Sequence, residues 1–151
     1  MESSPRAFKS SRGLFFYAID QGNIEVIDRY LRERKKRNID IGLNKLTRVS
    51  NSQSASPLYY TISMVGYEEI AKRLLLEEDI DLELKSRMSH GYPETPFEGA
   101  VKTNEVEIAE MILKKGYTPS EREIERAIED GNVEMLKMLR KYGYATEENS
   151  D

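Results

Sequence analysis

His90 is the only histidine in the 151 residues, and the chain contains no Cys. A zinc site needs several imidazole or thiolate ligands, and a nucleophile needs a base beside it. His90 lies between Ser89 and Gly91, so it offers one ligand or one general base without a second group of either kind. We expect His90 to be a solvated loop residue. Among the possible functions, an enzyme that uses His90 has the least support. The sequence predicts no enzyme, no metal site and no cofactor.

Two other chemical patterns are incomplete. The glycines have neither the spacing nor the Lys-Ser/Thr ending of a phosphate-binding loop. Carboxylates are abundant, as in Glu77-Glu78-Asp79 and at Glu121, Glu123 and Glu125, but such alternation on a helix is typical of a solvated face. The sequence therefore indicates neither nucleotide binding nor a catalytic acid pair.

Composition is that of one folded domain, with 38% hydrophobic and 33% charged residues. The first residues lack the apolar segment of a signal peptide, and no run approaches the roughly 18 apolar residues of a transmembrane helix. The absence of Cys suits a reducing compartment. We expect an intracellular protein, cytoplasmic with a nuclear location left open, that has no signal peptide and no membrane contact.

The charge is divided unequally along the chain. Residues 1–75 hold 13 Lys and Arg against 8 Asp and Glu, whereas residues 76–151 hold 10 against 19. A chain whose elements stack in sequence order would carry this asymmetry from one end to the other, and could steer an oppositely charged partner. The same charge division allows a different function, in which copies of this chain assemble head to tail into an oligomeric scaffold.

Four segments share one internal pattern. A small residue is followed by Gly or Asn, then by Glu, and then by an apolar pair that ends in Leu. Gly and Asn tolerate the left-handed conformation that ends a short helix, and Glu suits the first turn of the helix that follows. The pattern predicts helix-turn-helix units with one apolar face each. The segments are Ala18 to Leu31, Thr61 to Leu75, Ala100 to Leu113 and Ala127 to Leu139.

Two of the predicted first helices open with Ser56-Pro57-Leu58 and Thr95-Pro96-Phe97, in which Ser or Thr can cap the helix and Pro fits its first turn. Together with Ala100, Asn104, Glu107-Ile108 and Leu113-Lys114-Lys115-Gly116, the second of these resembles the ankyrin-repeat consensus of Thr-Pro-Leu-His, Ala, Gly, Glu-Val and Leu-Leu followed by Gly. Tetratricopeptide repeats are the alternative, but their pattern needs a Trp and the chain has none.

The resemblance implies an all-α fold, an ankyrin-like solenoid of about four stacked helix-turn-helix units with irregular hairpin loops. Its expected extent is residues 13–144, between a flexible N-terminal segment at 1–12 and a flexible acidic tail at 145–151. The repeats are expected near 13–38, 56–80, 95–117 and 121–144.

The chain departs from the consensus in two respects. The consensus His is replaced by Tyr59 and Glu98, so its hydrogen bonds must be absent or replaced, and we expect lower stability. Spacing is also irregular. A polar loop is expected at Leu43 to Ala55 and a lengthened one at Ser86 to Glu94, whereas the gap after Gly116 is too short for a full hairpin. A helix should therefore begin directly near Glu121.

Ankyrin-like proteins bind through hairpin tips and a concave face made by the first helices. The resemblance thus implies an interaction module, an inhibitor or modulator of a folded partner protein, similar to the host-directed ankyrin proteins of microbes and viruses. We expect a monomer, and nucleic acid is not the expected partner. The expected contact residues are Asp20, Gln21, Met64, Val65, Arg87, Met88, His90, Tyr92, Lys102, Thr103, Glu129 and Asp130.

Arg32-Glu33-Arg34-Lys35-Lys36-Arg37 is the densest charge cluster in the chain. Cations at the end of a helix are favoured by its dipole, which explains the run without any binding role. The functional alternative is a basic patch of Arg32, Arg34, Lys35, Lys36 and Arg37 that contacts an acidic partner, nucleic acid or a nuclear import receptor.

Overall fold

The computed structural model describes residues 11–88 and 92–146. Over these residues the chain is mostly helical, with eight helices and one small two-stranded sheet. The elements are α1 (Ser11–Asp20), α2 (Ile24–Arg37), β1 (Thr47–Ser50), β2 (Gln53–Ala55), α3 (Pro57–Ser63), α4 (Glu68–Leu75), α5 (Pro96–Lys102), α6 (Val106–Lys114), α7 (Glu121–Asp130) and α8 (Val133–Lys141).

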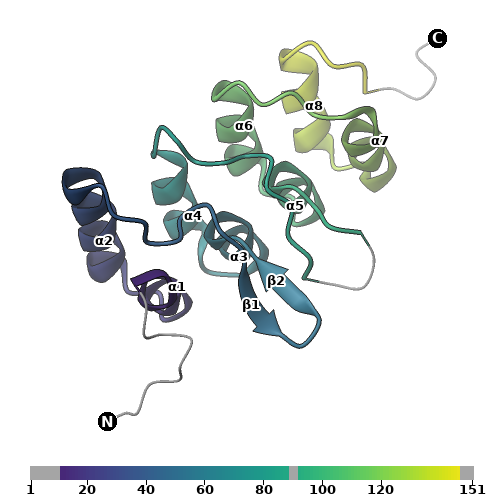
Figure 1. The fold of residues 1–151 in the computed structure, drawn as a ribbon. Coiled ribbons are helices and arrows are strands. Elements are labelled where there is room, and N and C mark those ends of the chain that lie inside the picture. The colour runs from purple at the N-terminus through teal and green to yellow at the C-terminus, as the bar shows by residue number, and fades with distance from the viewer. Residues whose placement is uncertain (1–10, 89–91, 147–151) are drawn as a thin grey trace.

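The helices form two rows in chain order. Helices α1, α3, α5 and α7 make up the row that we call inner, and each packs on the next. The outer row consists of α2, α4, α6 and α8, in which α4 packs on α6 and α6 on α8. Figure 1 shows the rows running side by side from the N-terminal to the C-terminal end. None of the helices among the described residues is both long and apolar enough to cross a membrane.

Local sequence explains where the inner helices begin. Ser56 and Thr95 accept hydrogen bonds from backbone N–H groups in the first turns of α3 and α5, and the Pro that follows each occupies the first helical turn, as predicted. Helix α7 begins at Glu121, also as predicted. Ser120 caps it in a capping box with Glu123, in which each side chain bonds the backbone N–H of the other residue.

The turn inside each helix pair contains a residue with positive φ. Asn104 has φ 58° and Gly131 has φ 67°, and Gly22 and Gly66 are the corresponding residues of the first two pairs. This conformation ends the inner helix and reverses the chain, so that the outer helix begins within a few residues. The shared pattern of the four segments therefore corresponds to one repeated turn geometry.

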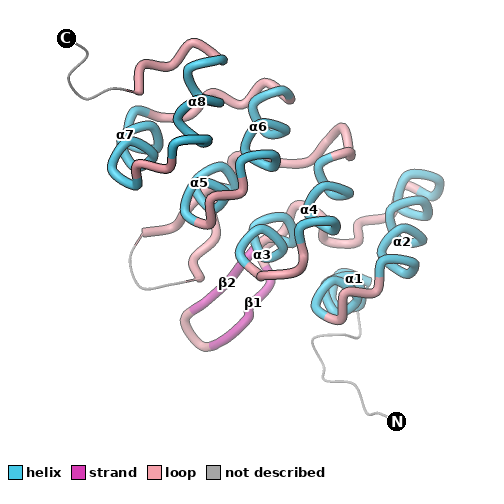
Figure 2. Tube along the Cα trace, turned by 180° about the vertical axis from the view of Figure 1, so that it is seen from behind, coloured by secondary structure: helices cyan, strands magenta, loops and turns pink. Residues whose placement is uncertain are grey.

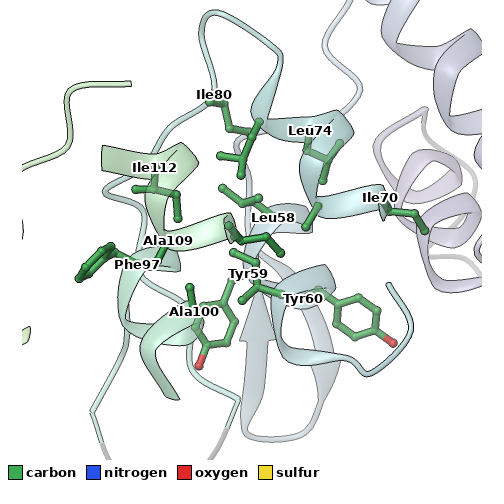
Figure 3. Close-up of a cluster of buried hydrophobic side chains, with 14 of the residues drawn as sticks. Leu58, Tyr59, Tyr60, Ile70, Leu74, Ile80, Phe97, Ala100, Ala109 and Ile112 are labelled. Atoms are coloured by element: carbon green, nitrogen blue, oxygen red, sulfur yellow. The ribbon is translucent and has the colours of Figure 1, made fainter. Parts of the chain in front are cut away.

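The core lies between the two rows and continues along them. Figure 3 shows Tyr59 directed from α3 toward Ala100 of α5, whereas Tyr60 leaves the same helix in another direction. Leu74 and Ile112 fill the space between α4 and α6 and are fully buried. Each buried side chain of this size stabilises the fold by about 1.5–3 kcal/mol relative to exposure. Packing between successive helix pairs thus stabilises the fold.

The prediction of an all-α fold, with a loop at Leu43 to Ala55, was wrong at one place. Strands β1 and β2 form an antiparallel hairpin there, with a register irregularity between Arg48 and Ser50. Polar residues form this hairpin because it gains a long-range partner: Ser54 exchanges two backbone hydrogen bonds with Arg87, of 2.9 and 2.8 Å. Figure 2 shows the hairpin projecting from the helices beside the loop that precedes α5.

Candidate partner-binding surface

The ends of the inner helices carry eight of the predicted contact residues, and we call this set the turn edge. Its members are Asp20, Gln21, Met64, Val65, Lys102, Thr103, Glu129 and Asp130. The first two turns are linked directly, since the Tyr67 hydroxyl donates to the carbonyl of Asp20 at 2.6 Å. All of these residues except Met64 are exposed. The structure therefore places the predicted residues on helix ends that follow one another along the inner row.

Asp20 is already engaged within the fold. Its carboxylate accepts a hydrogen bond from the Tyr60 hydroxyl, and its carbonyl accepts the bond from Tyr67. Burial, followed by the bond to Asp20, raises the pKa of Tyr60, so this hydroxyl remains a donor at neutral pH. Asp20 fixes α1 against α3, which leaves it less free than Gln21 to contact a partner.

Met64 and Val65 have opposite environments. Met64 is partly buried and packs against the core, whereas the Val65 residue is 95% exposed. The chain turns at Gly66, which has φ 92°, and this turn holds the Val65 side chain in solvent. A nearly fully exposed aliphatic side chain gains nothing from the fold of this chain.

Further along the turn edge, charged residues are held by ion pairs. The Lys102 Nζ lies 2.9 Å from a carboxylate oxygen of Glu94. The Arg126 guanidinium lies 3.8 Å from Glu94 and 3.6 Å from Asp130. Glu129 makes no ion pair within the described residues and points to solvent. The acidic end of the edge is therefore only partly neutralised.

Sequence reasoning missed a buried network that supports this edge. Glu98 is 1% exposed, and its carboxylate lies 2.9 Å from Arg122 and 3.6 Å from Arg126. Burial raises the pKa of Glu98, while the charge of Arg122 lowers it by a smaller amount. Glu94, which is also buried, accepts a hydrogen bond from the Tyr59 hydroxyl. Tyr59 and Glu98 thus each make a side-chain hydrogen bond to another residue of the fold.

Glu123 connects α7 to the start of α5. It is 2% exposed and accepts hydrogen bonds from the hydroxyls of Thr95 and Tyr117, the latter at 2.8 Å. The sequence contains a signal for part of this arrangement, because Ser120 followed three residues later by Glu123 is a capping-box pattern. No sequence pattern showed that the same carboxylate reaches Thr95.

The finger surface consists of β1, β2 and residues 86–88 and 92–94. The structure joins the two predicted loops through the Ser54–Arg87 backbone bonds, and the Gln53 side-chain amide donates to the carbonyl of Met88. Tyr92 is 79% exposed, with the Arg122 guanidinium 5.9 Å from its ring centre. His90 lies outside the described residues. The fingers are therefore one connected surface that presents Tyr92.

The basic run is divided by the fold. Arg34 pairs with Glu77 at 3.0 Å and with Asp79, and the hydrogen bond from Arg34 lowers the pKa of Asp79. Arg37 pairs with Glu33 at 2.9 Å within α2. On α2, four exposed cations make no ion pair within the described part of the chain: Arg29, Arg32, Lys35 and Lys36. Two of the five predicted patch residues therefore serve internal contacts.

No group of three or more His, Asp or Glu side chains in the described residues is arranged to hold a metal. No known protein-family model matches this chain, and neither does any curated protein.

Proposed function

We propose that this chain is an ankyrin-like solenoid of four helix pairs that binds a folded partner protein, as an inhibitor or modulator, without turnover or a cofactor. The succession of contacts along the inner row supports this architecture, and so does the positive φ in the turn of each pair. In such an array the turn edge and the finger surface border one concave face, where a partner can contact several helix pairs at once.

The exposure of the Val65 side chain is the observation on which the proposal rests. Its side chain is apolar, 95% exposed and held at the middle of the turn edge, between the ends of α1 and α5. An exposed apolar side chain gains free energy when a partner covers it, and the residues at the centre of an interface supply most of the binding energy. The neighbours of Val65 along the edge are polar or charged, as in Gln21, Lys102 and Thr103.

Tyr92 supplies a second exposed anchor on the finger surface. Tyr is enriched at interfaces because its ring offers a large contact area at a low entropic cost. The Arg122 guanidinium lies within cation–π distance of the ring. A partner that contacts both Val65 and Tyr92 would span the turn edge and the finger surface.

A photo-crosslinking amino acid placed singly at Val65, at Tyr92 and at Lys137 tests the proposal in cell lysate. Lys137 is the matched control, since it is exposed on α8 in the outer row. We expect one protein to be captured from Val65 and Tyr92, to be absent from the Lys137 sample, and to disappear when unlabelled chain is added. Capture of the same proteins from all three positions would contradict the proposal.

A scaffold built from copies of this chain is the second candidate. Glu121, Glu125 and Glu129 lie one turn apart on α7, are exposed, and make no ion pair within the described residues. The cations of α2 that make no ion pair among the described residues lie at the opposite end of the helix array. Sedimentation at low and high ionic strength distinguishes the candidates, because charge-driven assembly must dissociate as salt rises. A monomer at low salt would exclude the scaffold.

A further inference from the structure

A groove of about 210 Å³ lies between α2 and α4 in the outer row, away from the turn edge. Leu76, at the end of α4, lines it and is 72% exposed, and Leu31 of α2 forms part of its buried floor. The groove therefore has two apolar side chains among charged ones, and one of the two is exposed to solvent.

The acidic groups of this groove are neutralised from within the fold. Asp28 pairs with Arg73 at 2.6 Å, and Glu77 pairs with Arg34 at 3.0 Å. Both carboxylates have about a third or less of their side-chain surface exposed. Ion pairs with little exposure are screened less by salt than pairs at the surface. These acids are consequently not available to the other cations of α2.

Arg32 and Lys35 line the same groove, are exposed, and make no ion pair among the described residues. They are three residues apart on α2, so they lie on one face of the helix, and Lys36 and Arg29 extend the positive charge along it. The groove thus combines an exposed Leu with two available cations on its α2 wall.

We infer that this groove binds an acidic protein segment, in which one apolar side chain covers Leu76 and carboxylates on either side pair with Arg32 and Lys35. The two cations favour a partner of negative charge, and the exposed Leu76 favours a protein segment over nucleic acid. Nucleic acid binding draws on many phosphate contacts, whereas the available cations here are confined to α2. An acidic peptide can satisfy the cations and bury the Leu together.

The inference extends beyond the proposed function, since it concerns the outer row and not the turn edge. A protein bound at the turn edge leaves the groove between α2 and α4 accessible, so two partners could be held at once. The proposed function and this inference can therefore fail separately: the crosslinking at Val65 tests the first, and the peptide titration below tests the second.

The test is a fluorescence-anisotropy titration of the full chain with three labelled probes. The first is a short helical peptide with one Leu flanked by Glu residues three and four positions away. The second has the same Glu residues with Gln in place of Leu, and the third is a short single-stranded DNA. We expect the first probe to bind most tightly. Its affinity should fall about fivefold in an Arg32→Ser/Lys35→Ser variant and by a similar factor in Leu76→Ser.

Lys114→Ser/Lys137→Ser is the matched control, because it removes the same charge from exposed positions on α6 and α8. Its affinity for the first probe should be that of the wild type, and thermal unfolding should show all variants folded. The inference is overturned by equal loss of affinity in the control, by equal binding of the peptide without Leu, or by tighter binding of DNA that depends on Arg32 and Lys35. Self-association lost only in Arg32→Ser/Lys35→Ser would assign the groove to a second copy of the chain instead.

Discussion

Gly99→Ala tests how closely α5 approaches α3. A Cβ atom added at Gly99 would lie 2.9 Å from Cε2 and 3.2 Å from Cδ2 of Tyr59, and 3.6 Å from Cγ2 of Ile62. The Tyr59 ring is 1% exposed, and its hydroxyl is held by Glu94. The ring therefore cannot move aside without breaking that hydrogen bond or displacing the core around it.

Two effects of opposite sign decide the outcome. Ala in place of Gly in a helix interior stabilises by about 1 kcal/mol. Overpacking a tightly filled core costs about 1–3 kcal/mol. Because the contact is with ring carbons and not with a flexible chain end, we expect the second effect to exceed the first. Gly99→Ala should lose about 1 kcal/mol and lower Tm by roughly 2–4 °C in a chain of this size.

The assay is urea and thermal unfolding followed by circular dichroism, in a double-mutant cycle with Tyr59→Leu. Removing the ring relieves the contact, so in that background Gly99→Ala should be neutral or stabilising. The reasoning is refuted if Gly99→Ala stabilises the wild-type chain, or if it destabilises both backgrounds equally. Either result would mean that α5 and α3 are less closely packed at this point than the structure indicates.

Three further predictions concern caps and charges. Ser120→Ala removes the cap of α7 and should cost about 1 kcal/mol in urea unfolding. Burial raises the pKa of Glu98, so the folded chain holds this proton more tightly than the unfolded chain, and stability falls as pH rises above the ordinary value of 4.5. Glu98→Gln should therefore gain Tm relative to wild type at neutral pH, and the gain should disappear below pH 4.5, which calorimetry across pH can measure. Arg34→Ala leaves Glu77, whose side chain is 11% exposed, without its cation and should cost about 1–3 kcal/mol, whereas Arg37→Ala breaks an exposed pair and should cost under about 0.5 kcal/mol by the same assay.

The helices could be predicted because their signals are local. Ser56-Pro57 and Thr95-Pro96 each specify a cap and a first turn within a few residues, and Gly131 with its positive φ specifies a reversal. The hairpin of β1 and β2 has no comparable signal. Its residues are mostly polar, and the pairing of Ser54 with Arg87 joins positions that are remote in sequence. A contact between residues so far apart in the sequence does not alter the hydrophobic periodicity of either segment.

The surface was predictable only in part, for a similar reason. The repeat register located the turn residues, but it did not decide that Met64 turns inward and Val65 outward. The pairing of Arg34 with Glu77 depends on how α2 lies against the end of α4, so the basic run could not be divided from sequence. Composition shows which charges exist, and only the packing shows which of them remain available.

Among the described residues, the end helices pack on other helices on one side only: α1 packs on α2 and α3, and α8 packs on α6 and α7. Amide hydrogens in α8 should therefore exchange with solvent sooner than those in α4, because local opening at an end disrupts fewer contacts. A protein that spans the inner row would link α1 to α7 and slow exchange at both ends. Protection far from the contact would then report binding, even where no residue of the end helix is touched.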